Sequence, residues 1–334
     1  MAETSEKKIV TDQSEEKTEK ICPLAAYGGE KPPAPAWFER ALAVRPETGF
    51  TTVKGARIHY LRWGDRSKPG LLLCHGNGAH AHWWDFIAPY FAEEWHVVAM
   101  TFSGMGESDW RERYDMDTFA AEQIAVCEHA GLFEHEQKPT IVAHSFGGFV
   151  TIVTGADYGE RLNGTVLLDS PVNPPERRKN RPKGSDLVRP TKIYPTLEEA
   201  LARFRLAPSQ DCENHFAIDH IARHSLHEAE DGDGNRGWTW KFDPAIWRRF
   251  EARREPEELL KQTACRTAVF FGAESAIIHP ETGPYMGELL GHEVPFISIP
   301  EAKHHLMLDQ PLATVAALRT LLGEWRHSSP HRSF

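Results

Sequence analysis

Ser145 stands where an apolar run meets a helical pattern. The segment TIVAHSFGG begins at Thr140, so a buried strand would lead straight into the serine and then into a helix. Such a sharp turn exposes a nucleophilic serine above a sheet, and the residues two positions to either side must be small. Ala143 and Gly147 meet that demand. We predict that Ser145 is a nucleophile, although a structural turn could carry the same motif.

A histidine late in the chain could supply the general base. A serine hydroxyl is a poor nucleophile unless a neighbouring base takes its proton. His304 and His305 follow an apolar run at 296–299 and precede the last helical pattern. This order along the chain, serine first and histidine last, suits a serine triad. We choose His304 as the base and keep His305 as the alternative.

The segment LLLCHGNG at 71–78 could form the oxyanion hole. A glycine-containing turn after a buried strand can direct backbone N–H groups at a developing negative charge. The expected donors are the N–H groups of Asn77 and of Phe146, the residue after the nucleophile. The side chain of His75 is expected to brace the turn rather than to react.

Five segments together resemble the α/β-hydrolase superfamily, in its serine-nucleophile branch with a helical cap. They are HGNG at 75–78, FSGMGESD at 102–109, AHSFGG at 143–148, LLDSP at 167–171 and AKHHLMLDQP at 302–311. They occur in the family's order between about Phe50 and Trp325. The resemblance implies a Ser–acid–His triad. It also implies that FSGMGESD is a structural turn near the pocket.

The acid of the triad departs from the family pattern. Many members carry the acid in a G-x-x-D pattern after the strand equivalent to 267–271, but here Ser275 occupies that position. Some members place the acid instead at the end of the strand that follows the nucleophile's helix. Asp169 stands there, after the apolar run at 165–168. We favour Asp169 and keep Glu274 as the alternative.

The pattern of apolar runs predicts the fold class. It is α/β, with a mostly parallel central sheet, helices on both faces (the α/β-hydrolase fold) and an inserted helical cap. The predicted strands are 57–63, an antiparallel edge element, and 71–74, 96–101, 140–143, 165–168, 267–271 and 296–299; the predicted helices are 117–129, 146–158, 197–206, 213–228 and 311–325.

The same pattern predicts the domain organisation. Residues 1–36 are expected to form a disordered polar tail and a linker, with order beginning near Trp37. Residues 37–171 form the first part of the core, 172–247 the cap insertion and 248–334 the second part of the core.

Composition excludes several classes of function. The 334 residues carry a net charge of −10, which argues against nucleic acid as a partner. There is no apolar run long enough to span a membrane and no secretory signal at the start. The five cysteines form no CxxC pair, and Cys74 and Cys127 are expected to be buried thiols. These features predict a cytoplasmic protein that acts on a small molecule, and they leave its oligomeric state open.

We therefore expect a serine hydrolase that cleaves a carboxylic ester of a hydrophobic or aromatic small molecule through an acyl-enzyme. Trp83 and Trp84, just after the oxyanion turn, are expected to border the substrate pocket. Lactonase, acyl-CoA thioesterase and C–C bond hydrolase are the alternatives within the enzyme class, since one triad serves all of them. A non-catalytic ligand-binding protein on the same scaffold is the alternative from another class.

No cofactor and no metal are predicted. His220, His224 and His227 would share one face of a helix at 213–228, but they lack the glutamate of a metalloprotease motif. The Asp- and Gly-rich segment 231–237 resembles a calcium loop only superficially, and we expect a polar turn there. A basic run at 176–183 is expected to be a solvated loop, with attraction of an anionic substrate as the alternative.

Overall fold

An eight-stranded sheet forms the centre of the molecule. The computed structural model describes residues 21–177, 192–251, 254–291 and 294–328. The strand order is β1-β2-β4-β3-β6-β7-β11-β12. β1 and β2 run antiparallel to their neighbours, and all the other pairs are parallel. The strands are β1 (Glu47–Val53), β2 (Ala56–Trp63), β3 (Gly70–Cys74), β4 (His96–Met100), β6 (Thr140–His144), β7 (Gly164–Leu168), β11 (Arg266–Gly272) and β12 (Phe296–Ile299).

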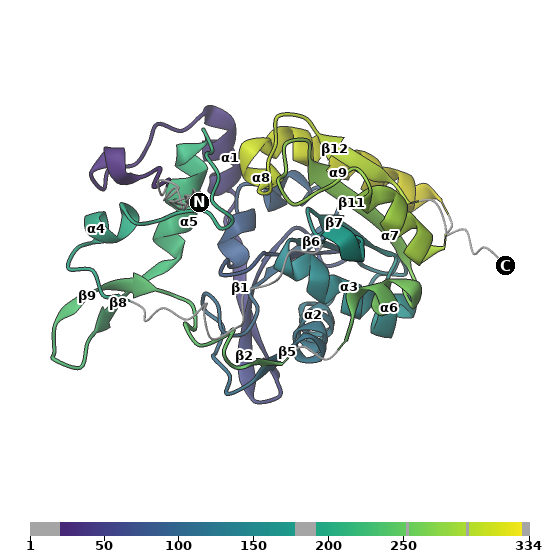
Figure 1. Ribbon diagram of the computed structural model, residues 1–334, viewed down its shortest axis with the longest axis horizontal. Helices are drawn as coiled ribbons and strands as arrows, with labels where there is room; N and C mark the ends of the chain where they lie inside the picture. Colours follow the sequence, from purple (N-terminus) through teal and green to yellow (C-terminus); the bar gives the residue numbers. More distant parts are fainter. Residues whose placement is uncertain (1–20, 178–191, 252–253, 292–293, 329–334) are drawn as a thin grey trace, which may run out of the picture.

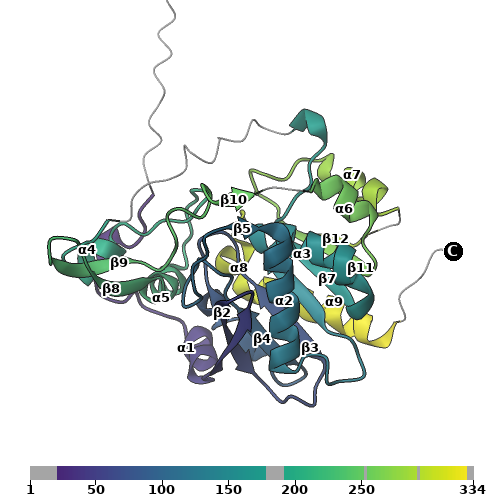
Figure 2. The ribbon, with the colours of Figure 1, turned by 90° about the horizontal axis from the view of Figure 1, so that it is seen from below.

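Helices cover both faces of this sheet. In Figure 2, α2 and α3 lie in front of the sheet and α9 lies behind it. One face carries α2 (Met116–Ala130), α3 (Phe146–Tyr158), α6 (Pro256–Lys261) and α7 (Thr282–Leu290), and the other carries α1 (Ala36–Ala43), α8 (Leu306–Asp309) and α9 (Pro311–His327). Every residue of β3, β4, β6 and β7 is buried, as expected for parallel strands covered on both sides. The predicted fold class is confirmed.

The segment 192–247, between β7 and β11, leaves the sheet and forms a separate layer beside it (Figure 1). It contains α4 (Leu197–Leu201), α5 (His215–His224) and a hairpin of β8 (Leu226–Glu230) and β9 (Arg236–Trp240). The remaining short elements are η1 (Ala25–Tyr27), η2 (Ala81–Trp84), η3 (Ala88–Tyr90), η4 (Gly159–Arg161) and η5 (Pro175–Arg177), together with β5 (Tyr114–Asp115), which pairs with β10 (Phe250–Glu251). We call residues 192–247 the cap.

The hairpin corrects the prediction of an all-helical cap. The helix expected over 213–228 ends at His224, and Leu226 begins a strand. Only Leu226 of the five residues LHEAE is buried, so the strand is defined by its antiparallel pairing with β9 rather than by an apolar pattern. The Asp231 side chain then accepts hydrogen bonds from the N–H groups of Asp233 and Asn235, and this closes the turn to β9. The helix expected over 197–206 likewise ends early, at Leu201.

The N-terminal segment also differs from the prediction. Residues 1–20 of the predicted tail lie outside the described residues, but order begins well before Trp37. Leu24 is only 2% exposed and belongs to the core. The hydroxyl of Tyr27 lies 2.9 Å from Nδ1 of His215, and Arg223 donates to the Gly29 carbonyl at 2.6 Å. This segment therefore packs against the cap helix α5. Burial of the apolar side chain of Leu24 offsets the conformational entropy that this segment loses when it becomes ordered.

Candidate active site

Ser145 occupies a strained turn between β6 and α3. Its φ of 51° and ψ of −116° lie in a region that side chains rarely adopt, so packing must hold it there. A Cβ on Gly147 would lie 2.5 Å from the carbonyl oxygen of His75, which explains why this position must lack a side chain. Ala143 is fully buried at the end of β6. The turn therefore has the geometry of a nucleophile elbow.

His304 lies against this serine. It sits in the loop after β12, and its Nε2 is 2.9 Å from Oγ of Ser145. The other predicted candidate, His305, points toward the cap, where its Nδ1 lies 2.8 Å from Oε1 of Gln210. The structure thus brings His304, and not His305, to the serine.

Asp169 stands behind His304. Its Oδ1 lies 2.9 Å from Nδ1 of His304, and the residue is completely buried at the end of β7. Two further donors fix the carboxylate: the N–H of Gly272 to Oδ2 at 3.0 Å and the hydroxyl of Ser275 to Oδ1 at 2.8 Å. Glu274, the alternative acid, is exposed. Ser145, His304 and Asp169 thus form one continuous chain of hydrogen bonds.

His144 is a site residue that the sequence analysis missed. Its Nε2–H donates to the backbone carbonyl of His304 at 2.9 Å, so the loop that carries His304 is tied to the strand that carries the serine. The ring of His144 lies 4.8 Å from that of His304. Burial holds the pKa of His144 well below its usual range, so the ring stays neutral. Its place directly before the serine was the only available signal.

The turn at 75–78 is held in one conformation by His75. Its Nδ1–H donates to the carbonyl of Gly76 at 2.7 Å, and its Nε2 accepts from the N–H of Phe102 at 3.0 Å. Burial lowers the pKa of His75 to about 4, which keeps Nε2 free to accept. The expected oxyanion donors are placed by this turn and by the first residue of α3, Phe146. In the described part of the chain, the N–H groups of Asn77 and Phe146 have no hydrogen-bond acceptor.

A cavity of about 980 Å³ lies between the cap and the sheet. It reaches the site at Asn77 and at His305, the residue next to His304. Large apolar side chains line it, namely Trp83, Phe204, Trp240, Phe242 and Trp247. Trp83 therefore borders the pocket as expected. Trp84 does not: it is only 1% exposed and belongs to the core.

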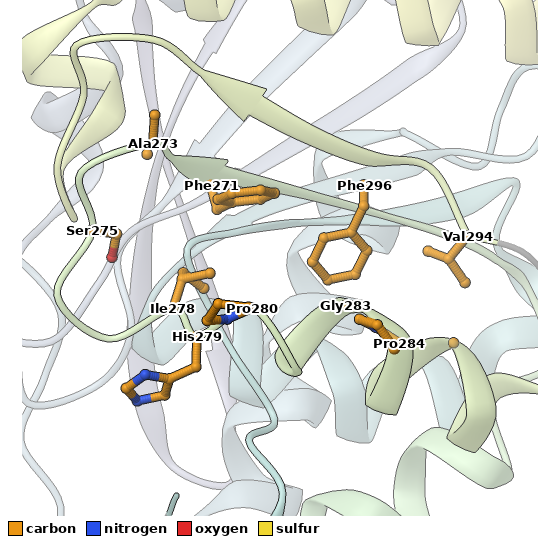
Figure 3. Close-up of a pocket in the computed structure, with 12 residues that line it drawn as sticks. Phe271, Ala273, Ser275, Ile278, His279, Pro280, Gly283, Pro284, Val294 and Phe296 are labelled. Atoms are coloured by element: carbon orange, nitrogen blue, oxygen red, sulfur yellow. The ribbon is translucent and has the colours of Figure 1, made fainter.

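A second cavity, of about 740 Å³, lies beside the loop that follows β11 (Figure 3). Phe271 of β11 and Phe296 of β12 line it together with residues at the start of α7. Gly272 and Ser275, two of the donors to Asp169, also border it. The larger cavity reaches Asn77, one of the two expected oxyanion donors, whereas this lining contains neither donor, so the larger cavity is the one that meets the predicted site.

Comparison with known proteins identifies the family. Residues 71–318 match the alpha/beta hydrolase family, so the chain belongs to it. Esterase Rv0045c of Mycobacterium tuberculosis is 22% identical over 81% of this chain and 88% of its own length. Epoxide hydrolase 4 of mouse is 29% identical, but this match spans only 35% of this chain and 32% of that protein. The thioesterase domain from the curacin biosynthetic pathway superimposes with a TM-score of 0.65 at 23% identity, covering 83% of this chain and 98% of that one, which shows the shared fold.

The chain is therefore a member of the alpha/beta hydrolase family, as the resemblance predicted, and it spans about a third of the length of the epoxide hydrolase relatives it matches. Among the described residues, the helices are all too short or too polar to cross a membrane. The basic run at 176–183 lies mostly outside the described residues, and so its expected role stays a prediction.

Proposed function

We propose that this protein is a carboxylic ester hydrolase that works through an acyl-enzyme. The observation that carries the proposal is the hydrogen-bond chain from Ser145 through His304 to Asp169, built on a strained elbow. A serine at this position with a histidine at 2.9 Å is the arrangement that activates a hydroxyl for attack on a carbonyl.

The first half of the reaction acylates the serine. Oγ of Ser145 attacks the ester carbonyl carbon while its proton passes to Nε2 of His304. Asp169 accepts from Nδ1–H and stabilises the positive charge on the imidazole. The N–H groups of Asn77 and Phe146 bind the oxyanion of the tetrahedral intermediate. As this intermediate collapses, the C–O bond breaks and the alcohol leaves with the proton from Nε2.

The second half returns the enzyme to its starting state. Water attacks the acyl carbon and gives a proton to Nε2 of His304. The second tetrahedral intermediate then releases the carboxylic acid, and the same proton returns to Oγ of Ser145. Every proton therefore moves through one imidazole, whose orientation is fixed at Nδ1 by Asp169 and at its backbone carbonyl by His144.

The substrate we propose carries a hydrophobic or aromatic acyl group. The aromatic lining of the 980 Å³ cavity supports this class, because such walls gain free energy by removing apolar surface from water. Two of these residues lie close to the site: the ring of Trp83 lies 5.7 Å from that of His305, and the ring of Trp247 lies 5.6 Å from that of Phe146.

The cations at the cavity favour one second candidate, a thioesterase that uses an anionic carrier. Lys192, Arg203 and Arg205 line the cavity and are exposed, and in the described residues none of them has an ion-pair partner. Such a group of side chains could attract phosphate or carboxylate groups on the leaving half of a thioester. The triad would act unchanged, with a thiol replacing the alcohol as the leaving group.

The proposal is tested with a fluorophosphonate probe and a series of p-nitrophenyl esters of increasing chain length. We expect stoichiometric labelling of the wild type and none of Ser145→Ala. Ester turnover should fall by about 10⁴-fold or more in that variant. Labelling that is equal in both proteins would remove Ser145 as the nucleophile, and absence of labelling in the wild type would favour the ligand-binding alternative.

Acyl-CoA thioesters assayed beside the esters distinguish the two candidates. If an anionic carrier is recognised, Arg203→Gln with Arg205→Gln should raise KM for the thioesters and leave KM for the neutral esters unchanged.

The similarity to epoxide hydrolases requires one more assay. Epoxide hydrolases of this fold use an aspartate nucleophile, and this chain has Ser145 in its place. We therefore expect no turnover of styrene oxide.

A further inference from the structure

A second group of chemically active side chains lies between the cap and the sheet domain, apart from the triad. His82 and Asp85 stand one turn apart in and just after η2. His220 and His224 stand one turn apart on the cap helix α5, on the face that packs against η2. We call these four residues the His–Asp cluster. They come from segments separated by more than 130 residues, so only the fold brings them together.

The cluster is compact around one carboxylate. Oδ2 of Asp85 lies 2.8 Å from Nδ1 of His82 and 2.8 Å from Nε2 of His220. The rings of His82 and His224 are stacked, with centroids 3.9 Å apart. Ligating atoms of His82, Asp85 and His224 all lie within 4.8 Å of one another. Small side-chain rotations would bring three such atoms to the separation that a tetrahedral metal requires.

The buried side chain of Asp85 provides a second, independent observation. Its side chain is only 10% exposed, and its Oδ1 is buried with no hydrogen-bond partner. A buried carboxylate oxygen without a hydrogen-bond partner destabilises the folded protein, so its presence needs an explanation. The ionic contacts that the structure gives to Asp85 are both made by its other oxygen, Oδ2, with His82 and His220. A cation beside Asp85 would give Oδ1 a partner.

The ligand types identify the class of cation. Imidazole nitrogens with a single carboxylate suit first-row transition metals, whereas calcium and magnesium prefer oxygen ligands. We propose that His82, Asp85 and His224 bind one Zn²⁺ ion, and that His220 orients the Asp85 carboxylate by its hydrogen bond. This departs from the sequence-based expectation of no metal, which grouped His220 and His224 with His227. His227 lies instead on β8 and is exposed.

The position of the site determines what the metal would do. Two proposed ligands belong to the segment that follows the oxyanion turn, and the third belongs to the cap. Beside them, Nε2 of His80 lies 2.8 Å from Oγ of Ser225, a second link between the same two segments. His80 and Ser225 both line the substrate cavity. Zn²⁺ would therefore fasten the cap to the wall of that cavity, so we expect it to act on stability and substrate access rather than on the chemical step.

Calorimetric titration of chelator-treated protein with ZnCl₂ tests the site. We expect one Zn²⁺ per chain with micromolar or tighter affinity in the wild type. Asp85→Asn and His224→Gln should each weaken binding by at least about 10-fold. His227→Gln is the matched control and should bind as the wild type does. Absence of saturable binding in the wild type, or equal affinity in all the variants, would overturn the proposal.

Two further measurements keep the result independent of folding and of the triad. Zn²⁺ should raise the melting temperature of the wild type and of His304→Gln, and should not raise that of the double variant His82→Gln/His224→Gln. If His304→Gln abolished binding, the metal would be at the triad and the proposal would be wrong. In crystals grown with Zn²⁺, anomalous scattering should peak between His82 and His224; a peak found only elsewhere would also overturn it.

Discussion

The hydroxyl of Ser275 donates a hydrogen bond of 2.8 Å to Oδ1 of Asp169. The same oxygen lies 2.9 Å from Nδ1 of His304. Ser275 occupies the position where many members of the family carry the acid of the triad. The carboxylate beside His304 has therefore moved from position 275 to position 169, and we call this change the exchange. The carboxylate comes from β7, and the residue after β11 has become a donor that supports it.

This exchange predicts the ranking of two variants. Asp169→Asn keeps the shape of the side chain but cannot hold the imidazole in the required tautomer, so kcat for ester hydrolysis should fall by about 10⁴-fold. Glu274→Gln alters an exposed side chain and should change kcat by no more than about twofold. Steady-state kinetics on one p-nitrophenyl ester measures both. The opposite ranking would assign the acid to Glu274.

The exchange also predicts a rescue. In the Asp169→Asn background, Ser275→Asp returns a carboxylate to the position that other members use, and we expect kcat to recover by at least about 10-fold. Ser275→Ala in the wild-type background removes one of three hydrogen bonds to Asp169 and should cost only about 10-fold. If the double variant were no better than Asp169→Asn alone, a carboxylate at 275 could not reach His304.

Gly147 should not tolerate a side chain. Ala at this position would place its Cβ 2.5 Å from the backbone carbonyl of His75, so the elbow and the oxyanion turn must separate. We expect Gly147→Ala to lower the free energy of unfolding by about 1–3 kcal/mol and to reduce kcat. Gly323→Ala is the control, because the space around Gly323 in α9 is open, and it should stabilise the protein by about 1 kcal/mol. Chemical denaturation measures both values.

Acid should destabilise the protein through its buried histidines. The pKa of His75 is about 4 in the folded protein, against 6.5 for a free side chain, because burial disfavours the charged ring. Between these two values the unfolded chain binds more protons than the folded one, so stability rises with pH and is lost as pH falls from 6.5 to 4. One such group contributes a slope of about 1.4 kcal/mol per pH unit.

Two variants isolate this contribution. His75→Gln should reduce the pH slope of the unfolding free energy by about 1.4 kcal/mol per unit within that window, whatever its effect on stability at pH 7. His327→Gln, which removes an exposed imidazole at the end of α9, should leave the slope unchanged. Urea denaturation at several pH values gives the slopes. An unaltered slope in His75→Gln would mean that this ring binds its proton equally well in the folded and unfolded states.

Much of the fold could be predicted from the sequence because its signals are local. The apolar runs that predicted strands correspond to β2, β3, β4, β6, β7, β11 and β12, and Gly131 ends α2 with a φ of 84°, as a C-capping glycine should. β1 was missed because Glu47–Val53 has only one buried residue and therefore lacks an apolar pattern. The cap hairpin was missed because its strands are short and polar.

Site residues that belong to a local backbone motif could be predicted from the sequence. Those that depend on contacts between distant segments could not. The elbow at Ser145 can be recognised from small residues two positions away. The choice between Asp169 and Glu274 depends instead on which side chain the loop after β11 leaves exposed. Trp83 and Trp84 are adjacent in sequence, yet one lines the cavity and the other fills the core. The partnership of His82 with His224 depends on how the cap packs, which no local pattern encodes.

The residues before α1 have a practical consequence for protein production. Trimming the chain to Trp37, where its globular pattern begins, would delete Leu24 from the core together with the contacts from Tyr27 to His215 and from Gly29 to Arg223. The contacts of Tyr27 and Gly29 hold α5, and Ser225, the residue that follows this helix, lines the larger cavity. A shortened chain would keep Ser145, His304 and Asp169 and yet lose these contacts with the cap, so recombinant work on this protein should retain the segment from residue 21 onward.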